Sequence, residues 1–295
     1  TWPRAPRHLR PMASAVPAAI AGTVLSNASR YGALQRVFND NLREFQYQRS
    51  QGTRYQIWTP PGVVFCKLKK DHFEHGRYAP PWSEWGFEES GTALRLVLGA
   101  LSGRWAVWLS KHHEQEQWVV ADNDSGRLFE AYHRAMNAFG LDAAEPDTAF
   151  PNLRLLLANE RFAPKFFDHG ALRSVHVHLP HAERATRPPR AALISGRFAE
   201  DVCAALGPEG ELHVVTDSEA VMEDASAHLM ESRRFAPCLG FPFYAEGVPS
   251  SYPAAALLRR DAAGGRADRA ASQRLFHSTW ERRPEQLPNF RFTGG

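Results

Sequence analysis

Residues 96–103 read Leu-Val-Leu-Gly-Ala-Leu-Ser-Gly, an apolar run that ends in a glycine loop. A second apolar run, one helix length later, covers residues 118–121 and ends at Asp122. In a nucleotide-type cofactor site the first strand ends in closely spaced glycines, which let bare backbone approach the ligand, and the second ends in an acid that binds a ribose. The two glycines and Asp122 fit this pattern, whereas Leu101 stands in the middle of the loop. The stretch therefore predicts the fold, whereas Leu101 departs from the pattern of a working cofactor site.

From Leu94 to about Leu239 the chain alternates short apolar runs with longer segments at helical period, which is typical of a parallel sheet with crossover helices. We expect strands near 94–98, 117–121, 152–157, 173–179, 210–215 and 274–281. We expect helices near 104–113, 126–139, 193–206 and 219–231. The prediction is a doubly wound, Rossmann-like α/β domain over residues 91–283.

The flanking segments have a different texture. Residues 1–90 are rich in Arg, Gln, Tyr and Trp, and we expect an extension that wraps on the domain or reaches a partner. Residues 245–273 are predicted to be a long mobile insertion before the last strand, because they hold Ala262-Ala263-Gly264-Gly265. Residues 284–295 are predicted to be a C-terminal tail, and the stretch from Arg282-Arg283 to Arg291 is basic.

Composition narrows the class of protein. The chain has 295 residues, of which 43% are hydrophobic, enough for a substantial core. No run approaches the roughly 18 apolar residues of a membrane span, so we expect no membrane partner. The three cysteines, Cys66, Cys203 and Cys238, are scattered singly, which favours a reducing compartment and predicts no metal site.

Charge is unevenly placed, although the formal net charge is only +3. The first acidic residue is Asp40, and arginines precede it among many Ala, Ser and Pro. This bias is typical of a mitochondrial transit segment, and a disordered basic arm is the alternative. The arginines are Arg4, Arg7, Arg10, Arg30 and Arg36.

Two basic segments suggest an RNA partner. Cations are interleaved with aromatic residues over 65–82, a mixture suited to phosphate contact and base stacking, although a solvated basic face beside core aromatics would look the same. A second group follows strand 173–179. The candidate RNA-binding residues are Lys67, Lys69, Lys70, Arg77, Arg184, Arg187 and Arg190.

Taken in order, the domain segments resemble the tRNA (guanine-N7)-methyltransferase family. Residues 98–103 stand where that family has its S-adenosylmethionine loop, and Asp122 stands where it has the ribose-binding acid. Residues 152–156, followed by Asn159, resemble the strand whose end contacts the adenine. Further matches are 172–180, which resembles the strand leading to Phe-Pro-Asp-Pro-Trp, 210–217, which ends in Thr216-Asp217, and 274–280, which resembles Arg-Leu-Gly-His-Gly-Val-Trp.

The resemblance covers about 94–282 and implies a class I methyltransferase fold that binds S-adenosylmethionine and acts on RNA. The cofactor contacts it implies are Gly99, Leu101, Gly103, Asp122 and Asn159. The acceptor positions it implies are His181, Glu183, Thr216 and Asp217.

Three departures from the family pattern fall on the chemistry. Leu101 replaces a glycine, and overpacking of this kind costs roughly 1–3 kcal/mol, a loss of about tenfold to a hundredfold or more in affinity. His181 replaces the aspartate of Phe-Pro-Asp-Pro-Trp and, when protonated, brings the wrong charge beside a sulfonium, while Glu183 could substitute for that acid.

The third departure is the family's C-terminal Thr-x-x-Glu. An ungapped register puts Arg266 and Arg269 there, and a gapped one offers Ser250, Ser251 and Tyr252 before Pro253, so neither restores a carboxylate. Nearby, His176 and His178 share one face of a strand, with His169 and His181 close in sequence. Without a carboxylate or thiol at ligand spacing, we expect packed or hydrogen-bonded histidines rather than a metal site.

We therefore expect a methyltransferase-like protein with a degenerate active site, more a pseudoenzyme than an enzyme, that binds no cofactor. Its expected role is that of an RNA-binding or structural factor in mitochondrial ribosome assembly or the mitochondrial ribosome, with ribosomal RNA and proteins of a ribonucleoprotein complex as partners. The alternatives are an active S-adenosylmethionine-dependent guanine-N7 methyltransferase of tRNA or rRNA, and a protein-interaction subunit without RNA contact.

Overall fold

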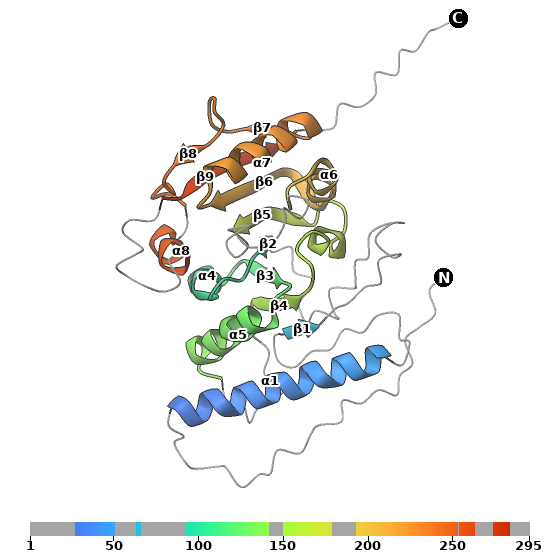
Figure 1. Cartoon of the computed structure of the whole chain (residues 1–295), viewed down its shortest axis with the longest axis vertical. Helices are drawn as coiled ribbons and strands as arrows, with labels where there is room; N and C mark the ends of the chain where they lie inside the picture. Colours follow the sequence, from blue (N-terminus) through green and yellow to red (C-terminus); the bar gives the residue numbers. More distant parts are fainter. Residues whose placement is uncertain are drawn as a thin grey trace, which may run out of the picture.

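The structure is a computed structural model of the chain. It describes residues 27–50, 63–65, 93–141, 150–178, 193–252, 254–262 and 274–283, which form a central sheet flanked by helices (Figure 1).

Nine strands are seen in the described residues, and they form one sheet in the order β1-β4-β3-β2-β5-β6-β9-β7, with β8 also paired to β9. The strands up to β6 run parallel, and β9 runs antiparallel to β6, β7 and β8. Strand order reverses at β2, as in a doubly wound sheet. The strands are β1 (Val63–Phe65), β2 (Leu94–Leu98), β3 (Gln117–Asp122), β4 (Leu153–Leu157), β5 (Leu172–His178), β6 (Leu206–Thr216), β7 (Phe235–Pro237), β8 (Ala245–Glu246) and β9 (Phe276–Arg282).

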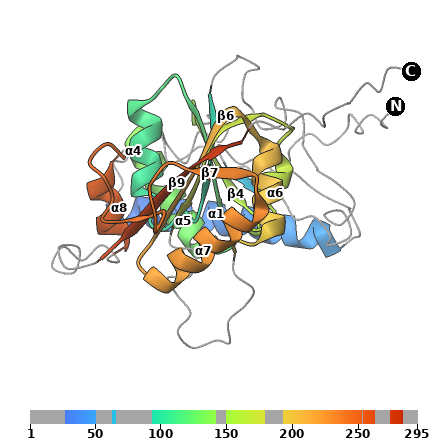
Figure 2. The same cartoon turned by 90° about the horizontal axis from the view of Figure 1, so that it is seen from above.

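Helices cover both faces of the sheet, so its central strands are buried on both sides (Figure 2). On one face lie α4 (Arg104–His112), α5 (Ser125–Phe139) and α8 (Ala255–Ala262). The other face carries α6 (Gly196–Ala205), α7 (Glu219–Ser232) and the short 3-10 helix η2 (Ala163–Phe166). This arrangement confirms the predicted Rossmann-like α/β fold.

Helix punctuation explains where the elements begin and end. The Asp124 side chain caps α5 by accepting from the backbone N–H groups of Gly126 and Arg127, and Gly140 ends the helix in a left-handed conformation. Ser218 caps α7 in the same way through the N–H of Val221. The predicted helices and core strands agree with these bounds to within a few residues.

Part of the N-terminal extension packs on the domain. Helix α1 (Asn27–Ser50) buries Leu34 and Phe38 in the cluster that also holds the inner face of α5. The Tyr31 hydroxyl donates to Glu130 of α5 at 2.8 Å, and β1 extends the sheet beside β4. Helix α1 and strand β1 thus contact the domain, and the rest of residues 1–90 lies outside the described part of the chain.

Residues 245–262 are more regular than the sequence suggested. Where we predicted a mobile insertion, β8 pairs with β9 and α8 packs against α4. Val248, Tyr252 and Leu258 are each less than 5% exposed. The sequence did not predict these elements, because the segment is rich in glycine and alanine. Its buried apolar residues are also widely spaced and match no short periodic pattern.

Candidate functional site

The carboxyl ends of β2, β3 and β4 meet at one edge of the sheet, next to the point where strand order reverses. The Gly99 N–H donates to the carbonyl of Ala121 at 2.9 Å, and the Ala158 N–H donates to the carbonyl of Asp122 at 3.1 Å. Ligands of doubly wound sheets bind at this position. The structure thus brings together the five positions that the family resemblance gave to the cofactor: Gly99, Leu101, Gly103, Asp122 and Asn159.

Both glycines of the loop are required by packing within the chain. A Cβ atom on Gly99 would lie 2.7 Å from the carbonyl oxygen of His178, and one on Gly103 would lie 2.5 Å from the Cα and Cβ of Ala131. Both residues also have positive φ, 92° and 77°. Their presence is explained without a ligand, so the glycines alone do not indicate cofactor binding.

Leu101 adopts the backbone conformation that a glycine would favour. Its φ is 50°, in the left-handed region, where a non-glycine residue costs roughly 1–2 kcal/mol. Its side chain packs partly against the cluster that contains Trp105 and Tyr252. The chain therefore carries a strained leucine at the middle of the loop and uses part of its side chain for packing.

Asp122 is fully buried, and its carboxylate is satisfied by the chain itself. Oδ2 accepts from the Ala100 N–H at 2.8 Å and from Arg127 Nε at 3.0 Å. Oδ1 accepts from the Asp124 N–H at 2.8 Å and from Arg127 Nη2 at 2.9 Å. A carboxylate has about four acceptor positions, so two backbone groups and a bidentate guanidinium occupy all of them.

Arg127 is the residue of this site that the sequence analysis missed. It lies in the first turn of α5, five residues after Asp122, and its side chain is only 26% exposed. A cation in the first turn opposes the helix dipole, and no acidic residue lies in that turn. An unfavourably placed arginine close behind a buried acid was the available signal.

Three other predicted positions lie at the same edge of the sheet. Asn159 follows β4, and its Oδ1 accepts from the N–H of Arg161 at 3.0 Å. Thr216 ends β6 and is buried, with its hydroxyl oxygen accepting from the Ser218 N–H at 3.2 Å. Asp217 follows it and is exposed. Strand β5 separates β6 from β2, so Thr216 and Asp217 flank the loop from the other side.

The remaining candidate residues lie outside the described part of the chain. They are the acceptor positions His181 and Glu183 and the basic residues Lys67, Lys69, Lys70, Arg77, Arg184, Arg187 and Arg190.

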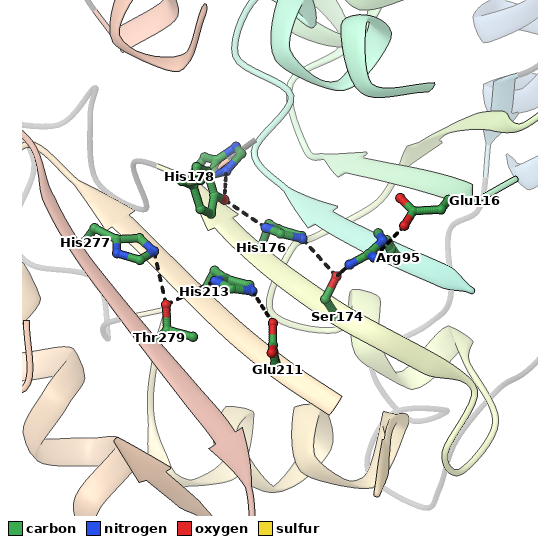
Figure 3. A network of polar contacts seen from close by, with 10 residues as sticks. Arg95, Glu116, Ser174, His176, His178, Glu211, His213, His277 and Thr279 are labelled. Atoms are coloured by element: carbon green, nitrogen blue, oxygen red, sulfur yellow. Dashed lines mark hydrogen bonds and ion pairs between the residues drawn. The ribbon is translucent and has the colours of Figure 1, made fainter. Parts of the chain in front are cut away.

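Four histidines line one face of β5, β6 and β9, and we call them the histidine cluster: His176, His178, His213 and His277 (Figure 3). The His176 ring stacks on the His213 ring with centroids 4.7 Å apart and planes 7° from parallel. The Tyr252 hydroxyl joins two members, lying 2.8 Å from His176 Nδ1 and 3.0 Å from His178 Nε2.

The Tyr252 hydroxyl links the hydrogen bonds of His176 and His178. Arg95 Nη1 donates to Ser174 Oγ at 2.9 Å, and the serine oxygen lies 2.9 Å from His176 Nε2. A hydroxyl has one proton and two acceptor positions, so Tyr252 bridges the two neutral rings when one ring nitrogen donates to it and the other accepts its proton.

Burial keeps His176, His178 and His277 in the neutral form. It lowers the pKa of His178 to about 3 and that of His277 to about 4, with the nearby His213 adding to both shifts. The pKa of His176 lies well below its ordinary value for the same main reason. Within the described residues no group of histidine, cysteine or acidic side chains is arranged to hold a metal ion, and His176 and His178 are hydrogen-bonded instead.

Comparison with known sequences also finds similarity to methyltransferases. A family model described as "Putative methyltransferase" matches residues 94–240. A tRNA (guanine-N(7)-)-methyltransferase of Anaeromyxobacter dehalogenans is 27% identical over 186 residues, which is 63% of this chain and 87% of that protein. The enzyme of the same name from Rubrobacter xylanophilus is 26% identical over 126 residues, which is 43% of this chain and 52% of that protein.

Among solved structures, the 16S rRNA methyltransferase KamB has a TM-score of 0.44 at 14% identity, over 70% of this chain and 99% of that one. TrmN from Thermus thermophilus has a TM-score of 0.39 at 18% identity, over 64% of this chain and 44% of that one. The strand order, rather than these modest scores, carries the fold assignment. In the described part of the chain no helix is both long and apolar enough to span a membrane. These matches confirm the resemblance of residues 94–240 to methyltransferases, and in particular to the tRNA (guanine-N7)-methyltransferase family.

Proposed function

We propose that this protein is a methyltransferase-like factor that has lost methyl transfer and acts by binding RNA, in mitochondrial ribosome assembly or in the mitochondrial ribosome. One observation carries the first half of the proposal: Asp122 is fully buried, and all four of its acceptor positions are used by Ala100, Asp124 and Arg127. A ribose diol needs a free carboxylate oxygen. S-adenosylmethionine therefore does not fit this arrangement unless Arg127 leaves.

Leu101, in the middle of the loop, supports the same conclusion. A leucine that occupies a glycine conformation adds bulk where backbone would otherwise approach a ligand, and part of that bulk packs into the core. The two glycines persist for packing reasons of their own. A protein selected for its fold, and no longer for its reaction, would keep Gly99 and Gly103 and tolerate Leu101.

The RNA half of the proposal rests on the relatives and on charge. Two similar proteins are named as tRNA methyltransferases. The sequence after β5 holds Arg184, Arg187 and Arg190, and β5 ends at the same edge of the sheet as β2, which leads into the Gly99 loop. The acid-free, arginine-containing stretch before Asp40 supports a mitochondrial setting.

RNA binding is tested by fluorescence anisotropy with labelled tRNA and rRNA fragments at two salt concentrations. We expect binding that weakens steeply with salt and weakens further when Arg184, Arg187 and Arg190 are changed together to glutamine. As a matched control, Arg233, Arg234 and Arg283 on the far edge of the sheet are changed in the same way. Binding that ignores salt and the first triple variant would overturn the RNA role and favour a protein-interaction subunit.

Loss of catalysis is tested by methyl transfer from labelled S-adenosylmethionine to the same RNAs, with the Anaeromyxobacter dehalogenans enzyme as positive control. We expect no transfer above background. The competing function, an active guanine-N7 methyltransferase, is favoured by the names of the relatives and would be established by turnover that stops when Asp122 is changed to alanine.

Location is tested by fusing residues 1–39 to a fluorescent protein. We expect the fusion to enter mitochondria and a variant with Arg4, Arg7 and Arg10 changed to glutamine to remain outside. Entry of neither fusion would remove the mitochondrial part of the proposal and leave the RNA part standing.

A further inference from the structure

Tyr252 ties a surface segment to the interior of the sheet. It lies in the connection between β8 and α8 and is 4% exposed, with its hydroxyl between His176 and His178. Its ring lies parallel to that of Trp105, the second residue of α4, at 5.8 Å and 17°. Residues 248–262 are otherwise held by apolar contacts of Val248 and Leu258 and by a hydrogen bond from Arg259 to the carbonyl of Val248.

We propose that Tyr252 is a pH-sensitive latch, which fastens residues 248–262 over the histidine cluster at neutral pH and releases them when His176 and His178 take up protons. The hydroxyl has one proton to give and satisfies both histidines only while one ring nitrogen donates to it and the other accepts from it. Protonating the accepting histidine turns its nitrogen into a donor, so the tyrosine loses the partner for its own proton.

Among the described residues, none offers a free negative charge close to protonated His176 and His178. From β6 and β9, His213 and His277 face the pair, and from β2 the guanidinium of Arg95 does so. The carboxylates behind them are committed, because Glu116 is paired with Arg95 at 2.6 Å and Glu211 accepts from His213 at 3.0 Å. On the helix side α4 contributes the Trp105 ring. Opening the segment to water is therefore the route by which the pair can be solvated.

The size of the effect follows from the ordinary pKa of histidine, about 6.5. If both histidines are solvated in the open form, the opening equilibrium rises by about a hundredfold between pH 7.5 and pH 5.5, about tenfold for each histidine. This inference does not rest on the proposed function, since it concerns only how the segment closes.

Hydrogen exchange of the full chain, read by mass spectrometry at pH 7.5 and 5.5 and corrected for intrinsic exchange rates, tests the latch. We expect the protection of residues 248–262 to fall by about a hundredfold and to lie, at both pH values, far below that of residues 96–98 in β2, which exchange only when the whole domain unfolds. Equal protection in both regions would overturn the latch, because it would mean that residues 248–262 open only by global unfolding. Unchanged protection of residues 248–262 would overturn it as well.

Two variants separate the latch from simple burial of histidines. His178→Gln keeps a neutral acceptor for Tyr252 at every pH, so the hundredfold pH effect should shrink to about tenfold. Tyr252→Phe keeps the ring but removes the hydroxyl, and should lower the protection of residues 248–262 already at pH 7.5. Tyr244→Phe is the matched control, because the Tyr244 hydroxyl donates to exposed Glu219 outside the cluster and its loss should leave these residues unchanged.

Discussion

Asp122 and the histidine cluster are both polar groups buried in the same sheet, and the chain compensates their burial in opposite ways. Asp122 meets a positive charge, the bidentate guanidinium of Arg127, and two backbone N–H groups. His176 and His178 instead stay neutral and share one hydroxyl, that of Tyr252. The burial of Asp122 therefore depends on the ion pair with Arg127, whereas the burial of His176 and His178 depends on both rings remaining unprotonated.

A fall in pH should produce the largest difference in stability between the Asp122 site and the histidine cluster. The folded protein holds the pKa of His178 at about 3 and that of His176 well below its ordinary value, whereas both approach about 6.5 in the unfolded chain. The neutral forms therefore stabilise the fold fully above pH 6.5, and this stabilisation is lost as the pH falls toward the folded values. Between pH 7 and pH 5 we expect a loss of up to about 4 kcal/mol, about 2 for each histidine.

Urea unfolding at pH 7, 6 and 5 measures this loss. In His178→Gln the drop should be smaller by about 2 kcal/mol, since one titrating group is gone. A wild-type protein whose stability is flat from pH 7 to pH 5 would contradict the account of the cluster.

Removing the cation should produce the next largest effect. Arg127→Met leaves Asp122 buried with two of its four donors, and breaking a buried ion pair in this way costs roughly 3 kcal/mol. Arg134→Met, also on α5, removes a hydrogen bond to the carbonyl of Ser102 and should cost only about 1 kcal/mol. Thermal unfolding of the two variants at pH 7 gives the comparison, and equal costs would mean that the Asp122 pair contributes nothing special.

The smallest effects on stability are expected in the loop of residues 99–103. Gly103→Ala places a Cβ atom against Ala131 at positive φ and should cost about 2 kcal/mol or more. Leu101→Gly relieves the left-handed leucine but gives up some packing and adds freedom to the unfolded chain, so the net change should stay within about 1 kcal/mol. The denaturant midpoints of the two variants measure both changes in stability. A larger loss in Leu101→Gly than in Gly103→Ala would mean that the packing of the Leu101 side chain contributes more to stability than the backbone conformation of the loop.

The sequence was sufficient for the framework and insufficient for the contacts. Strand β2 and helix α5 could be predicted nearly to the residue, because both combine strong periodicity with clear ends. Helix α1 could not, because its polar and apolar residues give no clean stripe before α5 supplies a surface for Leu34 and Phe38.

The candidate site shows the same division. The positions of Gly99, Leu101, Gly103 and Asp122 follow from strand order, so the sequence predicts that they meet. Which group satisfies Asp122 depends on the side-chain direction of Arg127, which no spacing rule gives. Tyr252 lies 74 residues beyond His178 in the chain and is joined to it only by tertiary packing, so its link to the histidines was invisible in the sequence.

The most direct test of the central claim is a calorimetric titration of the wild-type protein and of the Arg127→Met, Leu101→Gly double variant with S-adenosylhomocysteine. If the chain has filled its own cofactor position, the wild type should give no binding heat at ligand concentrations up to the millimolar range. The double variant should gain measurable binding if it remains folded, which circular dichroism checks. Micromolar binding by the wild-type protein would contradict the account, because it would show that Arg127 yields Asp122 to a ribose and that Leu101 leaves room for the cofactor.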